Sequence, residues 1–130
     1  MTIDTRNIGD IDVLYCRGNL TIGSGDQQLK DTVKGFLEQG RSTFVLNLTE
    51  VPYMDSSGLG ELVATYKRVA ERKGTVKLVL NPRGKELIGL LKLHLVFKVF
   101  SDLDQALASF GIPEEERIAF DLLDPESLHP

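Results

Sequence analysis

The sequence predicts an α/β domain built on a mixed, mainly parallel β-sheet, with an N-terminal antiparallel hairpin and flanking helices. Short segments rich in apolar and β-branched residues alternate with segments that repeat apolar residues at helical spacing. Two strand-like segments come first and are joined by a tight-turn pair, which indicates a hairpin. A chain of 130 residues with 42% hydrophobic and 26% charged residues is ordinary for one globular domain.

The first elements are the hairpin and a helix. Residues 2–8 and 11–18 are predicted strands, and the Gly9–Asp10 pair between them suits a turn. Residues 23–26 interrupt the strand pattern, and the helix that follows ends at Gly40. The apolar positions of this helix are Leu29, Val33, Phe36 and Leu37.

The centre of the chain carries a strand and a strongly amphipathic helix. Residues 41–48 form a short apolar segment, as expected for a central parallel strand that is covered on both faces. The helix is predicted from about residue 57 to residue 73, and Gly74 follows it. Its apolar positions are Leu59, Leu62, Val63, Tyr66, Val69 and Ala70.

The remaining elements continue the alternation. Residues 75–80 are a predicted strand, a third helix follows Asn81–Pro82, residues 95–100 are the last predicted strand, and residues 102–110 form the last predicted helix. The predicted order is therefore ββαβαβαβα. The βαβ crossovers require parallel pairing, whereas the hairpin is antiparallel, so the sheet is expected to be mixed.

The charge is unevenly distributed. Residues 112–130 contain six acids and one base, whereas the other 111 residues contain 14 bases and 13 acids. A near-neutral body without a basic face predicts no direct binding of nucleic acid. The chain lacks the roughly 18 consecutive apolar residues of a membrane span, and its start lacks the features of a signal peptide. We therefore expect a cytoplasmic protein that does not associate with membranes.

The acidic end is expected to lie outside the domain. The predicted elements are complete at Gly111, which gives a domain over residues 1–111 and an acidic C-terminal tail over residues 112–130. Two alternatives remain for the tail: it folds back as a short helix or serves a partner, or it is a loosely packed terminus. The apolar residues that bear on this choice are Ile118, Phe120, Leu122 and Leu123.

Cysteine and histidine give no sign of a metal site or cofactor. Cys16 is the single cysteine and lies in an apolar run, which predicts a buried, unreactive thiol. His94 and His129 are the two histidines, and neither belongs to a metal-ligand spacing. We expect no metal, no cofactor and no catalytic residue.

Two adjacent serines mark the start of the central helix. In the stretch YMDSSGLGEL, residues 53–62, Ser56 and Ser57 lie where the backbone N–H groups and the positive end of the helix dipole favour negative charge. One serine is expected to act as the N-cap, and we assign this role to Ser56. Gly58 and Gly60 either leave the helix start open to a partner or allow close packing on the sheet.

The element order, the stretches FVLNLTEVPYMD and SSGLGELVATYKRV, and the late LKLHLVFKVF resemble the STAS domain of bacterial anti-sigma factor antagonists over about residues 3–110. The resemblance implies that Ser57, with Ser56 as the fallback, is phosphorylated by an anti-sigma factor that is a serine kinase. The unphosphorylated protein would bind this kinase and release a sigma factor, and a PP2C-type phosphatase would reset the switch. The implied partner-binding residues are Asp55, Ser56, Ser57, Gly58, Leu59, Gly60 and Thr21.

One position departs from the family pattern. Members commonly carry an acidic residue soon after the second strand, whereas this chain reads Gly-Asn-Leu-Thr over residues 18–21 and has Thr21 in place of the usual aspartate.

Three alternative functions stay open. A STAS domain could act as a scaffold or nucleotide-binding regulatory module without a phosphoswitch. A hydrolase would use Ser57 as nucleophile, but the Gly-x-Ser-x-Gly pattern is absent. A receiver-like domain would form an acyl phosphate on Asp55, but no acidic pair follows the first strand. We favour a binding module that is not an enzyme.

Overall fold

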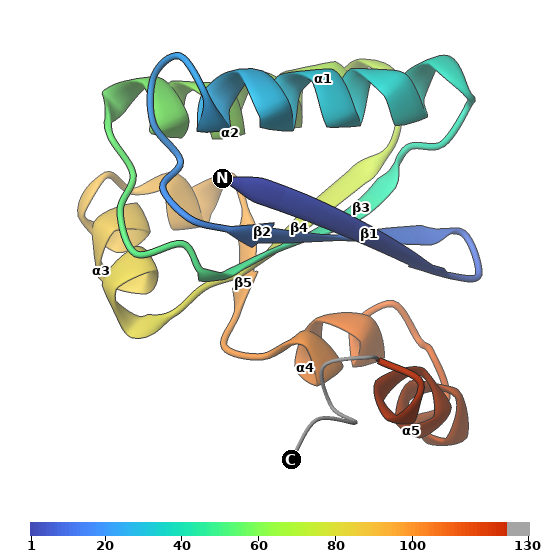
Figure 1. Ribbon diagram of the computed structural model, residues 1–130. Helices are drawn as coiled ribbons and strands as arrows, with labels where there is room; N and C mark the ends of the chain where they lie inside the picture. Colours follow the sequence, from blue (N-terminus) through green and yellow to red (C-terminus); the bar gives the residue numbers. More distant parts are fainter. Residues whose placement is uncertain (125–130) are drawn as a thin grey trace.

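The computed structural model describes residues 1–124 and confirms the predicted fold class. The sheet has the order β1-β2-β3-β4-β5, in which β1 pairs antiparallel with β2 and the other neighbours are parallel (Figure 1). The strands are β1 (Thr2–Ile8), β2 (Ile11–Arg17), β3 (Thr43–Glu50), β4 (Thr75–Val79) and β5 (Lys98–Phe100). The helices are α1 (Gly25–Glu38), α2 (Ser56–Glu71), α3 (Pro82–Leu90), the 3-10 helix η1 (Leu93–Leu95), α4 (Leu103–Ala108) and α5 (Glu114–Leu122).

Helices cover both faces of the sheet. Alternate side chains of a strand point to opposite faces, so the buried strands supply two hydrophobic clusters. Leu14 and Leu46 point to the face that α1 and α2 cover, whereas Val13 and Val45 point to the face that α4 and α5 cover. Figure 1 shows α1 and α2 above the sheet, α4 and α5 below it, and α3 at its left-hand edge. The candidate site therefore stands on a sheet that is buried on both sides.

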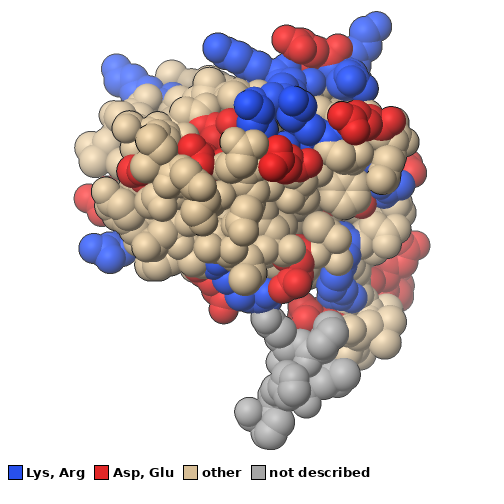
Figure 2. All heavy atoms as spheres, turned by 45° about the horizontal axis from the view of Figure 1, so that its top comes forward, with Lys and Arg blue, Asp and Glu red and all other residues tan. Residues whose placement is uncertain are grey.

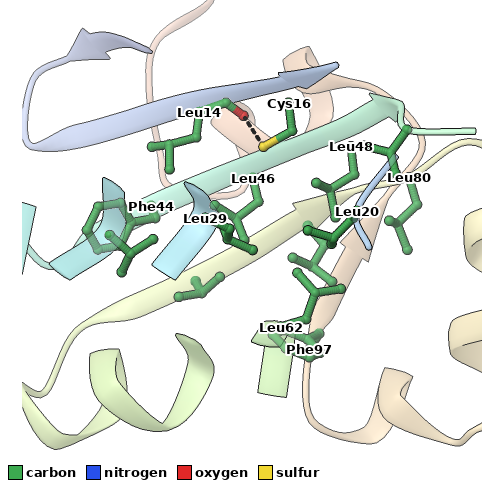
Figure 3. Packing of buried hydrophobic residues seen from close by; sticks show 14 of the residues in the cluster. Leu14, Cys16, Leu20, Leu29, Phe44, Leu46, Leu48, Leu62, Leu80 and Phe97 are labelled. Atoms are coloured by element: carbon green, nitrogen blue, oxygen red, sulfur yellow. Dashed lines mark hydrogen bonds between the residues drawn. The ribbon is translucent and has the colours of Figure 1, made fainter. Parts of the chain in front are cut away.

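The larger cluster holds the loop before α1 in place. Leu20, which follows β2, is fully buried beside Leu62 of α2 and Leu80 at the end of β4 (Figure 3). Cys16 lies in the same cluster, and its Sγ is 3.9 Å from the Leu14 carbonyl oxygen. Burial raises the pKa of this thiol to about 12, which confirms the prediction of a buried, unreactive cysteine.

The last strand is shorter than the sequence predicted. The prediction of a strand over residues 95–100 is wrong at its start, because the strand begins at Lys98. Lys92 adopts the left-handed conformation, with φ at 57°, and the Val96 and Phe97 N–H groups donate to the Leu93 carbonyl oxygen in a 3-10 turn. Phe97, which ends this turn, is buried in the larger cluster.

Part of the acidic tail is a helix that packs on the sheet. Phe120 of α5 is buried in the second cluster, and the Arg6 guanidinium lies 3.8 Å from the centre of its ring. Arg6 Nη2 also donates to the Phe120 carbonyl oxygen at 2.9 Å. Of the tail alternatives, the short folded-back helix is the one present; Ile118, Leu122 and Leu123 are exposed. The division of the chain at residue 111 stays a prediction, and residues 125–130 lie outside the described part.

None of the helices formed by residues 1–124 is long and apolar enough to cross a bilayer.

Candidate functional site

Two loops meet at the carboxyl edge of the parallel strands. The Leu20 N–H donates to the Tyr53 carbonyl oxygen at 3.0 Å, and the Asp55 N–H donates to the Leu20 carbonyl oxygen at 3.3 Å. Leu20 and Met54 form an isolated parallel bridge. The loop from β2 to α1 and the loop from β3 to α2 are thus joined like two short strands, which brings residues distant in sequence into one surface.

Asp55 holds this junction together. Its Oδ1 accepts the Gly58 N–H at 2.8 Å and so caps α2, while its Oδ2 accepts the Ile22 N–H from the neighbouring loop at 3.0 Å. These bonds, the one from Ile22 foremost, hold the pKa of the Asp55 carboxyl below its usual value. The prediction that Ser56 is the N-cap is wrong: α2 begins at Ser56 itself, so the residue that precedes the helix is Asp55.

Gly58 and Gly60 have different surroundings, so close packing explains one glycine and an open helix start the other. A Cβ on Gly58 would overlap the Leu20 carbonyl oxygen and lie 2.9 Å from the Leu20 carbonyl carbon, so Gly58 serves close packing. A Cβ on Gly60 would meet nothing within 4 Å. Gly60 is exposed, so this position leaves the start of α2 open to the surroundings.

Both serines lie in the first turn of α2. Ser56 is exposed and Ser57 is half-buried, and neither hydroxyl hydrogen-bonds to another residue of the described chain. Since Asp55 performs the capping, neither serine hydroxyl is needed to start the helix. Both hydroxyls are therefore available for modification at the positive end of the helix dipole.

Thr21 and Leu59 complete the set of residues singled out from the sequence. Thr21 is half-buried, accepts the Asp26 N–H through its carbonyl oxygen at 3.1 Å, and immediately precedes Ile22, which donates to Asp55. The structure therefore brings Thr21 to the same junction as Asp55. Leu59 is half-buried and packs against the larger cluster, so it contributes mainly to the seating of α2.

Two exposed apolar residues and one tether at this site are not among the residues predicted from the sequence. Ile22 and Tyr53, one on each loop, are 71% and 59% exposed. Figure 2 shows a broad area with few charges on its left, the side on which Figure 1 places the starts of α1 and α2. Asn81 caps α3 and donates through Nδ2 to the carbonyl oxygens of Thr49 and Val51, at 3.1 and 3.2 Å. The Asn81–Pro82 pair before the third predicted helix was the sequence signal for this cap.

The bonds of Asp55 limit the chemistry that the junction can carry out. Both carboxylate oxygens of Asp55 already accept backbone N–H groups, which weakens the receiver-like alternative because an acyl phosphate needs a free carboxylate oxygen. What remains is a hydrogen-bonded pair of loops with one exposed apolar side chain on each, Ile22 and Tyr53, and two serines at the start of the adjoining helix. Such a surface can dock a protein and can change charge.

Comparisons with known proteins agree with this architecture. A model of the STAS domain matches residues 2–106. The chain is similar in structure to a candidate anti-sigma factor antagonist of Thermotoga maritima, at 24% identity and a TM-score of 0.76, covering 82% of this chain and 92% of that one. It is also similar to an anti-sigma factor antagonist of Mycobacterium paratuberculosis, at 23% identity and a TM-score of 0.71, covering 83% and 92%.

A third similar protein is known in two forms. The Bacillus cell fate determinant SpoIIAA in its phosphorylated form is 17% identical, with a TM-score of 0.66, covering 84% of this chain and 99% of that one. The unphosphorylated form is matched at 15% identity, with the same TM-score and coverage of 83% and 96%. The TM-scores establish a shared fold, and the domain model spans most of the sequence, so the chain belongs to the STAS domain family.

Proposed function

We propose that the protein is an anti-sigma factor antagonist, a cytoplasmic binding module whose docking surface is the joined pair of loops and the start of α2. In its unphosphorylated form it binds a serine-kinase anti-sigma factor and so releases a sigma factor. Phosphorylation of Ser57, with Ser56 as the fallback, ends this binding, and a PP2C-type phosphatase restores it.

The observation that carries the proposal is that Asp55, and neither Ser56 nor Ser57, caps α2. Asp55 caps α2 and ties the loops, so the hydroxyls of Ser56 and Ser57 have no structural bond to lose on modification. Ile22 and Tyr53 supply exposed apolar area beside them, as expected for the centre of a protein interface. The STAS family and the solved antagonists with this fold support the same assignment.

Phosphate is expected to act at the interface and to leave the fold intact. A phosphoserine carries about −1.5 to −2 charge at neutral pH, which the start of a helix favours. SpoIIAA in its two forms matches this chain with the same TM-score, which supports a fold that tolerates the modification. The Asp55 carboxylate accepts the Gly58 N–H at the helix start, so repulsion between the two anions is expected to turn the phosphate away from this carboxylate.

The magnitude is enough for a switch. A partner that covers the loops would have to desolvate a dianion, and unfavourable charge placement at an interface costs several kcal/mol. Even a cost of about 3 kcal/mol would weaken binding about 100-fold.

The test uses the kinase of the protein's own pathway. The purified protein is incubated with the serine-kinase anti-sigma factor and ATP, and the phosphorylated residue is mapped by mass spectrometry. Ser57→Ala is expected to bind the kinase but to accept no phosphate, and the neighbouring Ser56→Ala is the matched control. Ser57→Asp is expected to bind about 100-fold more weakly while its melting temperature stays near that of the wild type. Phosphate on neither serine would refute the switch.

A further inference from the structure

A basic, apolar bend protrudes after α3. We call it the leucine knob, formed by Leu90, Leu91, Leu95 and Val96. Leu90 and Leu95 are 74% and 76% exposed, and the left-handed conformation of Lys92 turns the chain between them. Exposed basic residues of α3 and the bend, Arg83, Lys85 and Lys92, outnumber the acid Glu86. Several large apolar side chains exposed close together in the sequence are typical of an interaction site.

An acidic, apolar cleft lies between α4 and α5. Its volume is about 350 Å³. We call it the acidic cleft. Its apolar walls include Leu103, Leu107, Ile118 and Leu122, of which Ile118 and Leu122 are more than half exposed. Its charged lining consists of Asp104, Glu114, Asp121, Asp124 and Arg117. Arg117 pairs with Asp104 at 2.9 Å and Arg6 pairs with Asp124 at 3.6 Å. Four acids line the cleft, so it still has a net negative charge when both arginines are counted.

We propose that the leucine knob of one copy of this chain docks in the acidic cleft of a second copy. The two surfaces combine exposed apolar side chains with opposite charge, and they lie on different sides of the molecule. Figure 1 places α3 and α5 on opposite sides of β5, so the knob does not reach the cleft of its own chain. The contact is therefore between molecules.

The leucine knob and the acidic cleft are complementary in size and in charge. An apolar cavity of about 150 Å³ holds a benzene molecule, so the acidic cleft has room for the side chains of two leucines. Burial of Leu90 and Leu95 would remove apolar surface from water on the knob, and Ile118 and Leu122 would be covered at the same time. Lys92 would lie at the rim of the cleft near Glu114, where attraction between opposite charges sets the orientation.

The symmetry of such a contact predicts the form of the assembly. The two surfaces are different patches of one molecule, so the contact is head-to-tail, and each added copy leaves one knob and one cleft free. The weight-average molar mass is expected to rise steadily with protein concentration and to show no plateau at a dimer. Because the contact area is small, the association is weak and reversible.

Sedimentation equilibrium of the full chain over a concentration series tests the proposal. Lys92→Glu and Glu114→Lys each place like charges at the contact, and each is expected to weaken association at least ten-fold. An equal mixture of the two variants restores attraction between the knob of Glu114→Lys and the cleft of Lys92→Glu, so the mixture is expected to associate. Lys34→Glu on α1 and Glu116→Lys on α5 are matched controls, because Lys34 is exposed on a helix that contributes no residue to the knob and Glu116 is not part of the cleft lining.

Each possible result decides the question. A wild type that stays monomeric overturns the proposal, as does a plateau at the mass of a dimer, which would indicate a symmetric contact. A mixture of the reversal variants that stays monomeric also overturns it, because the two surfaces are then not each other's partners. Controls that weaken association as much as Lys92→Glu would indicate nonspecific charge effects. None of these outcomes depends on kinase binding or on phosphorylation of Ser57.

Discussion

Gly58→Ala tests the close approach between the first turn of α2 and the loop that carries Leu20. The added Cβ would overlap the Leu20 carbonyl oxygen and would lie 2.9 Å from both the Leu20 carbonyl carbon and its Cγ. Two of these atoms belong to the backbone, and Leu20 is fully buried, so rotation of a side chain cannot relieve the overlap. The loop before α1 has to move away from α2.

The expected loss follows from the bonds at this junction. Overpacking costs about 1–3 kcal/mol, and separation of the loops weakens two backbone hydrogen bonds, Leu20 to Tyr53 and Asp55 to Leu20, worth about 0.5–1.5 kcal/mol each. Alanine regains up to about 1 kcal/mol of helix propensity. The net destabilisation is therefore about 1–5 kcal/mol, the sum of the costs less this gain.

Urea unfolding of Gly58→Ala beside Gly60→Ala gives a matched measurement. Gly60 lies two residues further along the same helix, and a Cβ there meets nothing within 4 Å, so its substitution is expected to stabilise the protein by up to about 1 kcal/mol. The two variants should shift the unfolding midpoint in opposite directions. A Gly58→Ala variant as stable as Gly60→Ala would refute the argument that the glycine is required by close packing.

Three further predictions concern Asp55, Lys77 and α5. Asp55→Asn keeps a good N-cap but removes the carboxylate. Because the pKa of Asp55 is lowered in the folded protein, the wild type should exceed this variant in stability by the full amount above about pH 4. The difference should vanish as the pH falls through the lowered pKa, which acid unfolding of the two proteins would measure. Burial lowers the pKa of Lys77, so its charge destabilises the folded protein at neutral pH, and this cost fades as the pH rises toward about 10. Lys77→Met should therefore raise the thermal unfolding midpoint at neutral pH and raise it less near pH 10. An equal gain at neutral pH and near pH 10 would contradict this. Phe120→Ala should lower the free energy of unfolding, measured with urea, by about 3 kcal/mol, because Phe120 is buried. Substitution of the exposed Leu123 by alanine should change it by less than about 0.5 kcal/mol. Equal effects would show that α5 is not part of the core.

Much of the fold could be predicted because periodicity records which side of each element is buried. The apolar spacing of Leu62 and Val69 indicated the face of α2 that packs on the sheet, and both side chains are buried there. The run over residues 95–100 was ambiguous, because a short apolar segment fits a strand or a tight turn equally well. The left-handed residue Lys92 decides in favour of the turn, and local sequence does not reveal that choice.

The candidate site was predicted in place but not in its internal bonds. Aspartate and serine are both good N-caps, so a shift of one residue in the start of α2 changed the capping residue from Ser56 to Asp55. The requirement for glycine at position 58 comes from Leu20, which belongs to another loop. Such a contact appears only when the fold places the two loops together.

The helices that bury the second face of the sheet, α4 and α5, are the last elements of the chain to be synthesised. This order affects folding on the ribosome. The strands that carry Val13, Val45 and Val79 emerge well before Phe120, which helps to close the face on which they lie. At about 5–20 residues per second, the nascent chain exposes this apolar face for seconds after β4 has emerged. A slow stretch of codons between β5 and α5 would lengthen that interval and increase the demand for chaperones.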